Sequence, residues 1–93
     1  MVKHIVMWKF KTGEEVAMQQ FLEGLRSLYG KIDVLKKLEI GVSNPDSQYD
    51  AVLISEFDSF AGLEQYKNDP RHKAVSALCK KIRTDRVSID YEF

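Results

Sequence analysis

The chain has 93 residues and carries 14 basic and 14 acidic side chains, so its formal net charge is zero. This length corresponds to a single domain, and a balanced, dispersed charge predicts neither a nucleic-acid-binding surface nor attraction to an anionic membrane. The lone cysteine, Cys79, excludes an internal disulfide. Because there is no signal-peptide pattern and no apolar run of about 18 residues, we expect a cytoplasmic protein that does not span a membrane.

Residues 2–11 are rich in strand formers and alternate in character, which predicts a first β-strand. His4 and Trp8 lie on one face of this strand, and Ile5 and Met7 lie on the other. We expect the face of His4 and Trp8 to point toward the helices.

Thr12 and Glu15 have the spacing of a capping box, which predicts a helix that begins with Thr12 as its N-cap. Apolar residues follow at helical spacing, and Gly30 is expected to end the helix. The apolar face of this helix consists of Met18, Phe21, Leu22, Leu25, Leu28 and Tyr29.

Two further strands are predicted over residues 35–42 and 49–57, joined by the polar turn of residues 43–47. Asp58 or Ser59 is expected to cap a short helix on which Phe60, Leu63 and Tyr66 share one side.

Asp69 and Pro70 interrupt this helix and start another, with aspartate at the N-cap and proline at the first helical position. Its apolar side carries His72, Val75, Leu78, Cys79 and Ile82. A last strand alternates Val87, Ile89 and Tyr91 with Asp90 and Glu92, and the two acidic residues are expected to face water.

The order of elements is β-α-β-β-α-β with a split second helix, which predicts an α+β, ferredoxin-like domain with a four-stranded antiparallel sheet. Helices can cover only one face of such a sheet, yet residues 51–54 are apolar on both faces. An apolar face without helices needs another partner. We therefore expect a homodimer that forms through the sheet face opposite the helices.

Tyr66 and His72 are the candidate reactive residues, with His4 as a possible third member. His72 would be the third residue of its helix, where the dipole disfavours imidazolium and leaves a neutral base. Tyr66 would orient the imidazole or donate to a developing oxyanion. The opposing interpretation is that all three are core residues with structural hydrogen bonds. The residues expected to line the pocket are Val6, Trp8, Phe21, Leu22, Leu25, Leu53, Ser55, Phe60, Leu63, Val75 and Leu78.

Four segments together resemble the stress-responsive A/B barrel (Dabb) family over essentially the whole chain. They are KHIVMWKFK at residues 3–11, YDAVL at residues 49–53, Tyr66 with Pro70 and His72, and DYE at residues 90–92. The resemblance implies a dimeric α+β barrel built from two ferredoxin-like units. The family also includes an enzymatic branch, the olivetolic acid cyclase type, which closes a linear polyketide by aldol condensation without a cofactor.

The catalytic tyrosine and histidine of that branch match Tyr66 and His72, and its first-strand histidine matches His4. Three positions depart from the pattern: a second tyrosine falls at Leu25, a smaller pocket residue falls at Trp8, and the first histidine of His-Pro-x-His is Asp69. These departures count against polyketide-sized substrates.

Three hypotheses remain open. The first is a homodimeric stress-related or small-ligand-binding protein, with a small apolar or carbonyl ligand. The second is a cofactor-independent cyclase or lyase with His72 as general base, which requires that Trp8, Phe21 and Leu25 leave room beside His72. The third is an antibiotic-biosynthesis-type monooxygenase, suggested by fold analogy alone. Two histidines without a nearby carboxylate or thiolate pattern predict no metal site, and no cofactor motif is present.

Overall fold

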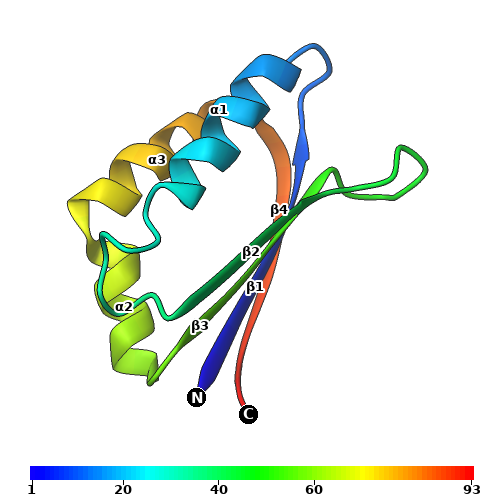
Figure 1. Ribbon diagram of the computed structural model, residues 1–93. Helices are drawn as coiled ribbons and strands as arrows, with labels where there is room; N and C mark the ends of the chain where they lie inside the picture. The colour runs from blue at the N-terminus through cyan, green and yellow to red at the C-terminus, as the bar shows by residue number, and fades with distance from the viewer.

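The computed structural model describes all 93 residues and has the predicted ferredoxin-like arrangement. The elements are β1 (Val2–Phe10), α1 (Glu15–Arg26), β2 (Lys37–Val42), β3 (Ala51–Phe57), α2 (Phe60–Asn68), α3 (Pro70–Ile82) and β4 (Arg83–Glu92). The strands form one antiparallel sheet in the order β2-β3-β1-β4, and the three helices lie on one side of it (Figure 1). No helix is both long and apolar enough to cross a membrane.

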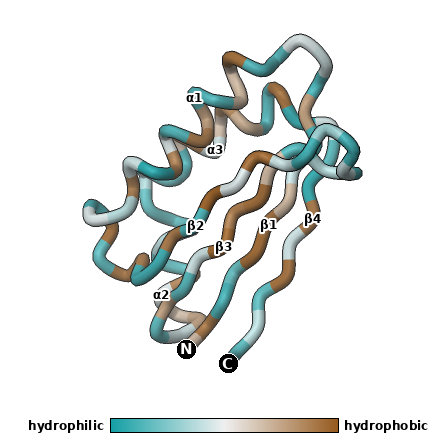
Figure 2. Tube along the Cα trace, turned by 45° about the vertical axis from the view of Figure 1, so that its right-hand side comes forward, coloured by the Kyte–Doolittle hydropathy of each residue, from teal (hydrophilic) through white to brown (hydrophobic).

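The alternation of β1 separates the two faces of the sheet as predicted. Val2, His4, Val6 and Trp8 are buried against the helices, while Met7 points to the opposite face. The central strands β1 and β3 carry most of the hydrophobic colour of the sheet, whereas β4 alternates (Figure 2). The core therefore lies between the inner face of β1 and β3 and the three helices.

The predicted capping box at the start of α1 is wrong. The helix begins at Glu15, and its N-cap residue, Glu14, makes no side-chain capping bond. Gly13 adopts a positive φ of 87° and closes a turn in which the Glu14 amide donates to the Lys11 carbonyl. This turn displaces Thr12 from the N-cap position, because the chain is not yet helical there.

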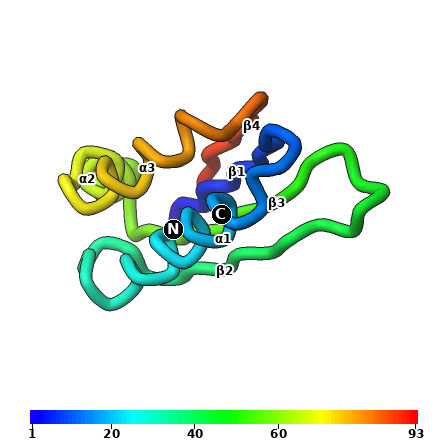
Figure 3. Tube along the Cα trace, turned by 90° about the horizontal axis from the view of Figure 1, so that it is seen from above, coloured from blue at the N-terminus to red at the C-terminus, as the bar shows by residue number.

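The predicted end of α1 at Gly30 is also too late, because the helix ends at Arg26. The amides of Leu28 and Tyr29 donate to carbonyls three residues back, which tightens the chain into turns, and Gly30 then takes a positive φ of 86°. Leu28 remains buried, but Tyr29 is exposed rather than part of the apolar face. The connection of residues 43–50 extends away from the rest of the molecule (Figure 3).

Of the two predicted caps of α2, Asp58 and Ser59, the structure selects Ser59, whose hydroxyl accepts a hydrogen bond from the Gly62 amide at 3.1 Å. We expect Ser59→Ala to lower the free energy of unfolding by about 1 kcal/mol, because an amide of the first turn loses its acceptor. Ser59→Asp should restore most of that loss. Urea denaturation measures both variants, and an equal loss in the two would contradict the capping role.

Candidate functional site

The break between α2 and α3 brings Tyr66 and His72 together. Their ring centroids lie 4.4 Å apart with planes tilted by 49°, and Tyr66 also packs against Phe57 in the core. His72 is the third residue of α3, as predicted, because Pro70 is the first. Both rings are thereby held on the inner side of the helical layer, which faces the sheet.

Asp69 holds the break in place. Its backbone is extended, and its Oδ1 accepts the Arg71 amide at 2.8 Å, while the Arg71 guanidinium bonds both carboxylate oxygens and the Lys31 carbonyl. The side-chain and backbone hydrogen bonds from Arg71 lower the pKa of Asp69 to about 2. Asp69 is therefore an ionised helix cap that fixes where α3 begins, and His72 with it.

Two buried polar atoms near the break have no hydrogen-bond partner: the hydroxyl of Tyr66 and Nδ1 of His72. The two side chains therefore form no hydrogen bond with each other through the Tyr66 hydroxyl. Burial raises the pKa of Tyr66 far above its usual value, so it remains a neutral phenol. Burial is also the main cause that lowers the pKa of His72, although hydrogen bonding toward the Lys67 backbone opposes it. His72 is accordingly a neutral imidazole near pH 7.

His4 faces the same region from β1 and is hydrogen-bonded through Nδ1 to the carboxylate of Asp90. Lys67 on α2 lies 3.5 Å from the other carboxylate oxygen. Burial lowers the pKa of His4, with the bond to Asp90 acting in the opposite direction. Burial raises the pKa of Asp90, but its bond to His4 and the nearby charges together lower it. A neutral imidazole that donates from Nδ1 to a carboxylate keeps Nε2 free as a base.

The expectation that Asp90 faces water is corrected by this contact. The register of β1 with β4 places Asp90 opposite His4 and Arg86 opposite Trp8, on the inner face of the sheet. Because β4 is an edge strand, the inward-facing carboxylate of Asp90 lies at the border of the core and stays partly exposed to solvent. The alternation of β4 groups Arg86, Ser88 and Asp90 on one face, but a sequence does not show which face points inward.

A small cavity of about 70 Å³ lies between the sheet and the helices beside both histidines. It is lined by His4, Val6, Trp8, Phe21, Leu25, Leu53, Lys67, His72, Ser76, Cys79, Arg83 and Arg86. The rings of Trp8 and Phe21 meet edge to face on this wall, with their centroids 5.1 Å apart. An apolar cavity of about 150 Å³ accommodates benzene. Room therefore remains beside His72, but for a ligand of only a few heavy atoms.

Several residues expected to line the pocket lie elsewhere. Leu22, Ser55 and Leu63 are fully buried in the core without reaching the cavity, and Val75 and Leu78 pack against the core from α3. Phe60 is 45% exposed, because it is the first residue of α2 and the buried part of that helix begins at Gly62. Tyr66 does not line the cavity either; it contacts His72, which does.

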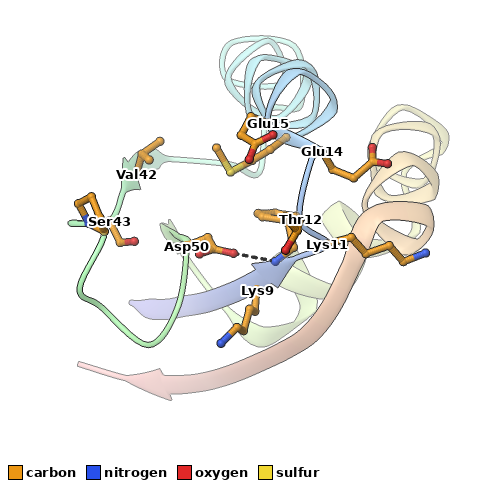
Figure 4. Close-up of a pocket in the computed structure, with 11 residues that line it drawn as sticks. Lys9, Lys11, Thr12, Glu14, Glu15, Val42, Ser43 and Asp50 are labelled. Carbon is orange, nitrogen blue, oxygen red and sulfur yellow. Dashed lines mark hydrogen bonds between the residues drawn. The ribbon is translucent and has the colours of Figure 1, made fainter.

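A larger, open hollow of about 310 Å³ lies at the other end of the sheet, near the start of α1 (Figure 4). Its wall mixes lysine and glutamate side chains, and Asp50 is committed to a hydrogen bond from the Phe10 amide at 2.8 Å. No histidine or cysteine reaches it. The molecule contains no group of three or more His, Cys, Asp or Glu side chains that could hold a metal ion. The cavity of about 70 Å³ beside His4 and His72, named the histidine cavity below, is therefore the candidate site.

The geometry defines a ferredoxin-like α+β domain with a small cavity between its sheet and its helices. Residues 2–93 match the family described as Stress responsive A/B Barrel Domain, and the chain belongs to that family. No curated protein matches the chain.

Solved structures similar to the chain share its fold. A dimeric protein of unknown function from Bacteroides fragilis is 34% identical, with 99% of this chain and 95% of that chain covered and a TM-score of 0.92. A dimeric ferredoxin-like protein of unknown function from Thermobifida fusca is 23% identical, with 99% and 90% covered and a TM-score of 0.87. The hydroxynitrile lyase from Passiflora edulis is 16% identical, with 97% and 90% covered and a TM-score of 0.84. The last two likenesses show the fold alone.

Burial of two neutral histidines makes stability depend on pH. The unfolded histidines bind protons near pH 6.5, whereas the folded pKa values of His4 and His72 are lower. The unfolded state thus binds more protons just below pH 6.5, and stability falls as the pH drops through that window, by up to about 1.4 kcal/mol per pH unit for each histidine.

Urea denaturation between pH 7.5 and pH 5 measures this dependence. His72→Gln should reduce the slope, because one titrating group is removed. The lowered pKa values of Asp69 and Asp90 affect stability only below their ordinary value of 3.8, so they do not contribute in this range. An unchanged slope in the variant would show that His72 titrates normally in the folded protein.

Proposed function

We propose that this protein binds a small carbonyl compound in the cavity beside His4 and His72. The observation that carries the proposal is the presence of two neutral imidazoles on the wall of one cavity, one of them held by Asp90. Buried polar groups without a partner destabilise a fold by about 1–3 kcal/mol each. The unpartnered Nδ1 belongs to His72, which lines the cavity, and is therefore better explained by a ligand site than by core packing alone.

The same arrangement favours a second candidate function, which is proton transfer on the bound carbonyl compound without a cofactor. A neutral imidazole near pH 7 can take a proton from the carbon next to the carbonyl group, and the electron pair moves to the carbonyl oxygen as an enolate forms. Return of the proton regenerates the compound. His72 is the candidate base, Tyr66 is the positioning residue that packs against it, and His4 is a second proton carrier oriented by Asp90. The small cavity counts against closure of a long polyketide.

Exchange of methyl protons for deuterium tests this chemistry directly, with pyruvamide as a neutral carbonyl probe. We expect the protein to accelerate the exchange in D₂O, and His72→Gln to reduce the acceleration by roughly 100-fold, the lower range for loss of a general base. The measurement is the decay of the methyl signal in proton NMR. Lys73→Gln changes the exposed residue next to His72 on α3; it is the matched control and should leave the rate of exchange unchanged.

Pyruvamide that shifts the imidazole signals of His4 and His72 without faster exchange would support ligand binding and exclude the enzymatic candidate. No shift and no exchange with pyruvamide, and none with its charged analogue pyruvate, would overturn the proposed function.

We further propose that the protein is a homodimer in which a second copy covers the helix-free face of the sheet. This face carries Ile5, Met7, Val87 and Ile89, which line a shallow hollow of about 220 Å³. Ile5 pairs with Ile89 and Met7 with Val87, so the apolar side chains form one continuous patch. The two solved relatives from Bacteroides fragilis and Thermobifida fusca are described as dimeric, which supports the same assembly.

Ile89→Asp should convert the dimer to a monomer, because each interface would then bury two carboxylates without partners. Sedimentation velocity distinguishes the dimer from the 10.7 kDa monomer. Val16→Asp is the matched control, because Val16 is 74% exposed on α1, away from the sheet. Wild-type protein that sediments as a monomer at micromolar concentration would overturn the assembly.

A further inference from the structure

The histidine cavity has an excess of positive charge. Its wall contains three permanent cations, Lys67, Arg83 and Arg86, and no acidic side chain. The adjoining carboxylate of Asp90 is already engaged by His4 and Lys67. Because the chain as a whole has equal numbers of acidic and basic residues, this excess is local and not a consequence of composition.

The two arginines of the wall have no carboxylate partner. The ion pairs of the molecule involve His4, Arg26, Lys36, Lys67 and Arg71, and neither Arg83 nor Arg86 is among them. Nη1 of Arg86 makes only a long hydrogen bond, 3.4 Å, to the hydroxyl of Ser88. Most of their donors are therefore free to bind another group.

The environment of Arg86 is unfavourable for a cation without a counterion. Partial burial lowers the pKa of Arg86 and the neighbouring charge of Arg83 lowers it further, while Cys79 and Asp90 partly oppose them. The charge of Arg86 is also a smaller cause, after burial, of the lowered pKa values of His4 and His72. An anion between the guanidinium groups would relieve this repulsion and complete the site.

We propose that the carbonyl compound bound in the cavity is a small carboxylate, held by Arg86 with Arg83 while its carbonyl end lies beside the histidines. This inference rests on the proposed function and deepens it. The planar fork of a guanidinium matches a carboxylate with two parallel hydrogen bonds. A cavity of about 70 Å³ limits the compound to a few heavy atoms, as in a two- or three-carbon oxo acid.

Binding of two nearly isosteric probes tests the charge requirement. Pyruvate and pyruvamide differ in the carboxylate, and their dissociation constants are measured from the imidazole signals of His4 and His72 in NMR titrations. We expect pyruvate to bind at least tenfold more tightly than pyruvamide. Arg86→Gln should weaken the binding of pyruvate by roughly 10- to 100-fold, the range for loss of a hydrogen bond between charged groups, and weaken the binding of pyruvamide much less.

Two further variants make the result specific. Arg86→Lys keeps the charge but not the fork, so it should recover only part of the affinity for pyruvate. Lys80→Gln removes an exposed cation of α3 that has no ion pair and should have no effect. Because the side chain of Arg86 is only partly buried and lies on an edge strand, its variants should fold, which their thermal midpoints would check.

The outcomes separate the two levels of the proposal. Equal affinity for pyruvate and pyruvamide, or no response of pyruvate binding to Arg86→Gln, would overturn the anion site and leave the carbonyl-binding function standing. Absence of binding by both probes would overturn both. If Lys80→Gln lost as much affinity for pyruvate as Arg86→Gln, the cause would be the net charge of the protein, and the proposed site would also be overturned.

Discussion

The proline at position 70 is the constraint on which the candidate site depends. In a continuous helix the ring of Pro70 would clash with the carbonyl of Tyr66, four residues earlier, and would supply no amide to it. The chain instead ends α2 and the Asp69 amide donates to that carbonyl at 3.2 Å. α3 then starts in a new direction, and His72 turns back against the ring of Tyr66. A straight helix over the same residues would separate the two rings along its axis.

Burial and charge then determine the protonation states at the site. His4 and His72 are neutral chiefly because they are removed from water, and the cations around them act in the same direction. Asp90 remains ionised because His4 and Lys67 contact it. The result is a pair of bases next to positive charge, an environment in which a developing negative charge on a ligand is stabilised. Cys79 has a pKa raised mainly by burial, so its thiol does not contribute a nucleophile.

The size of the cavity is limited by the large side chains on its wall. Trp8 and Phe21 pack edge to face across the space under the helices, and Leu25 adds to the same wall. Large side chains at these positions leave a cavity of about 70 Å³. The same ferredoxin-like fold accommodates other contents in other proteins, so the side chains on the inner face, rather than the fold, determine what binds.

Much of the fold was predictable because local chemistry specified it. The alternation of β1, the cap at Ser59, the break at Asp69 and Pro70, and the order of elements were all predicted and are all present. The errors at α1 arose from glycines. Gly13 and Gly30 take positive φ values and close turns, and a capping pattern does not reveal where such turns begin.

The elements, the two faces of β1 and the placement of His72 in the first turn of α3 follow from local sequence, because each depends on residues within a few positions of one another. The partners of the site depend on how distant elements pack. Asp90 and His4 are 86 residues apart, and they meet because the register of β1 with β4 places them opposite each other. Arg83, Arg86 and Lys67 converge on one cavity from β4 and α2 for the same reason. Strand register and helix packing depend on long-range contacts, and no local pattern encodes which charges they bring together.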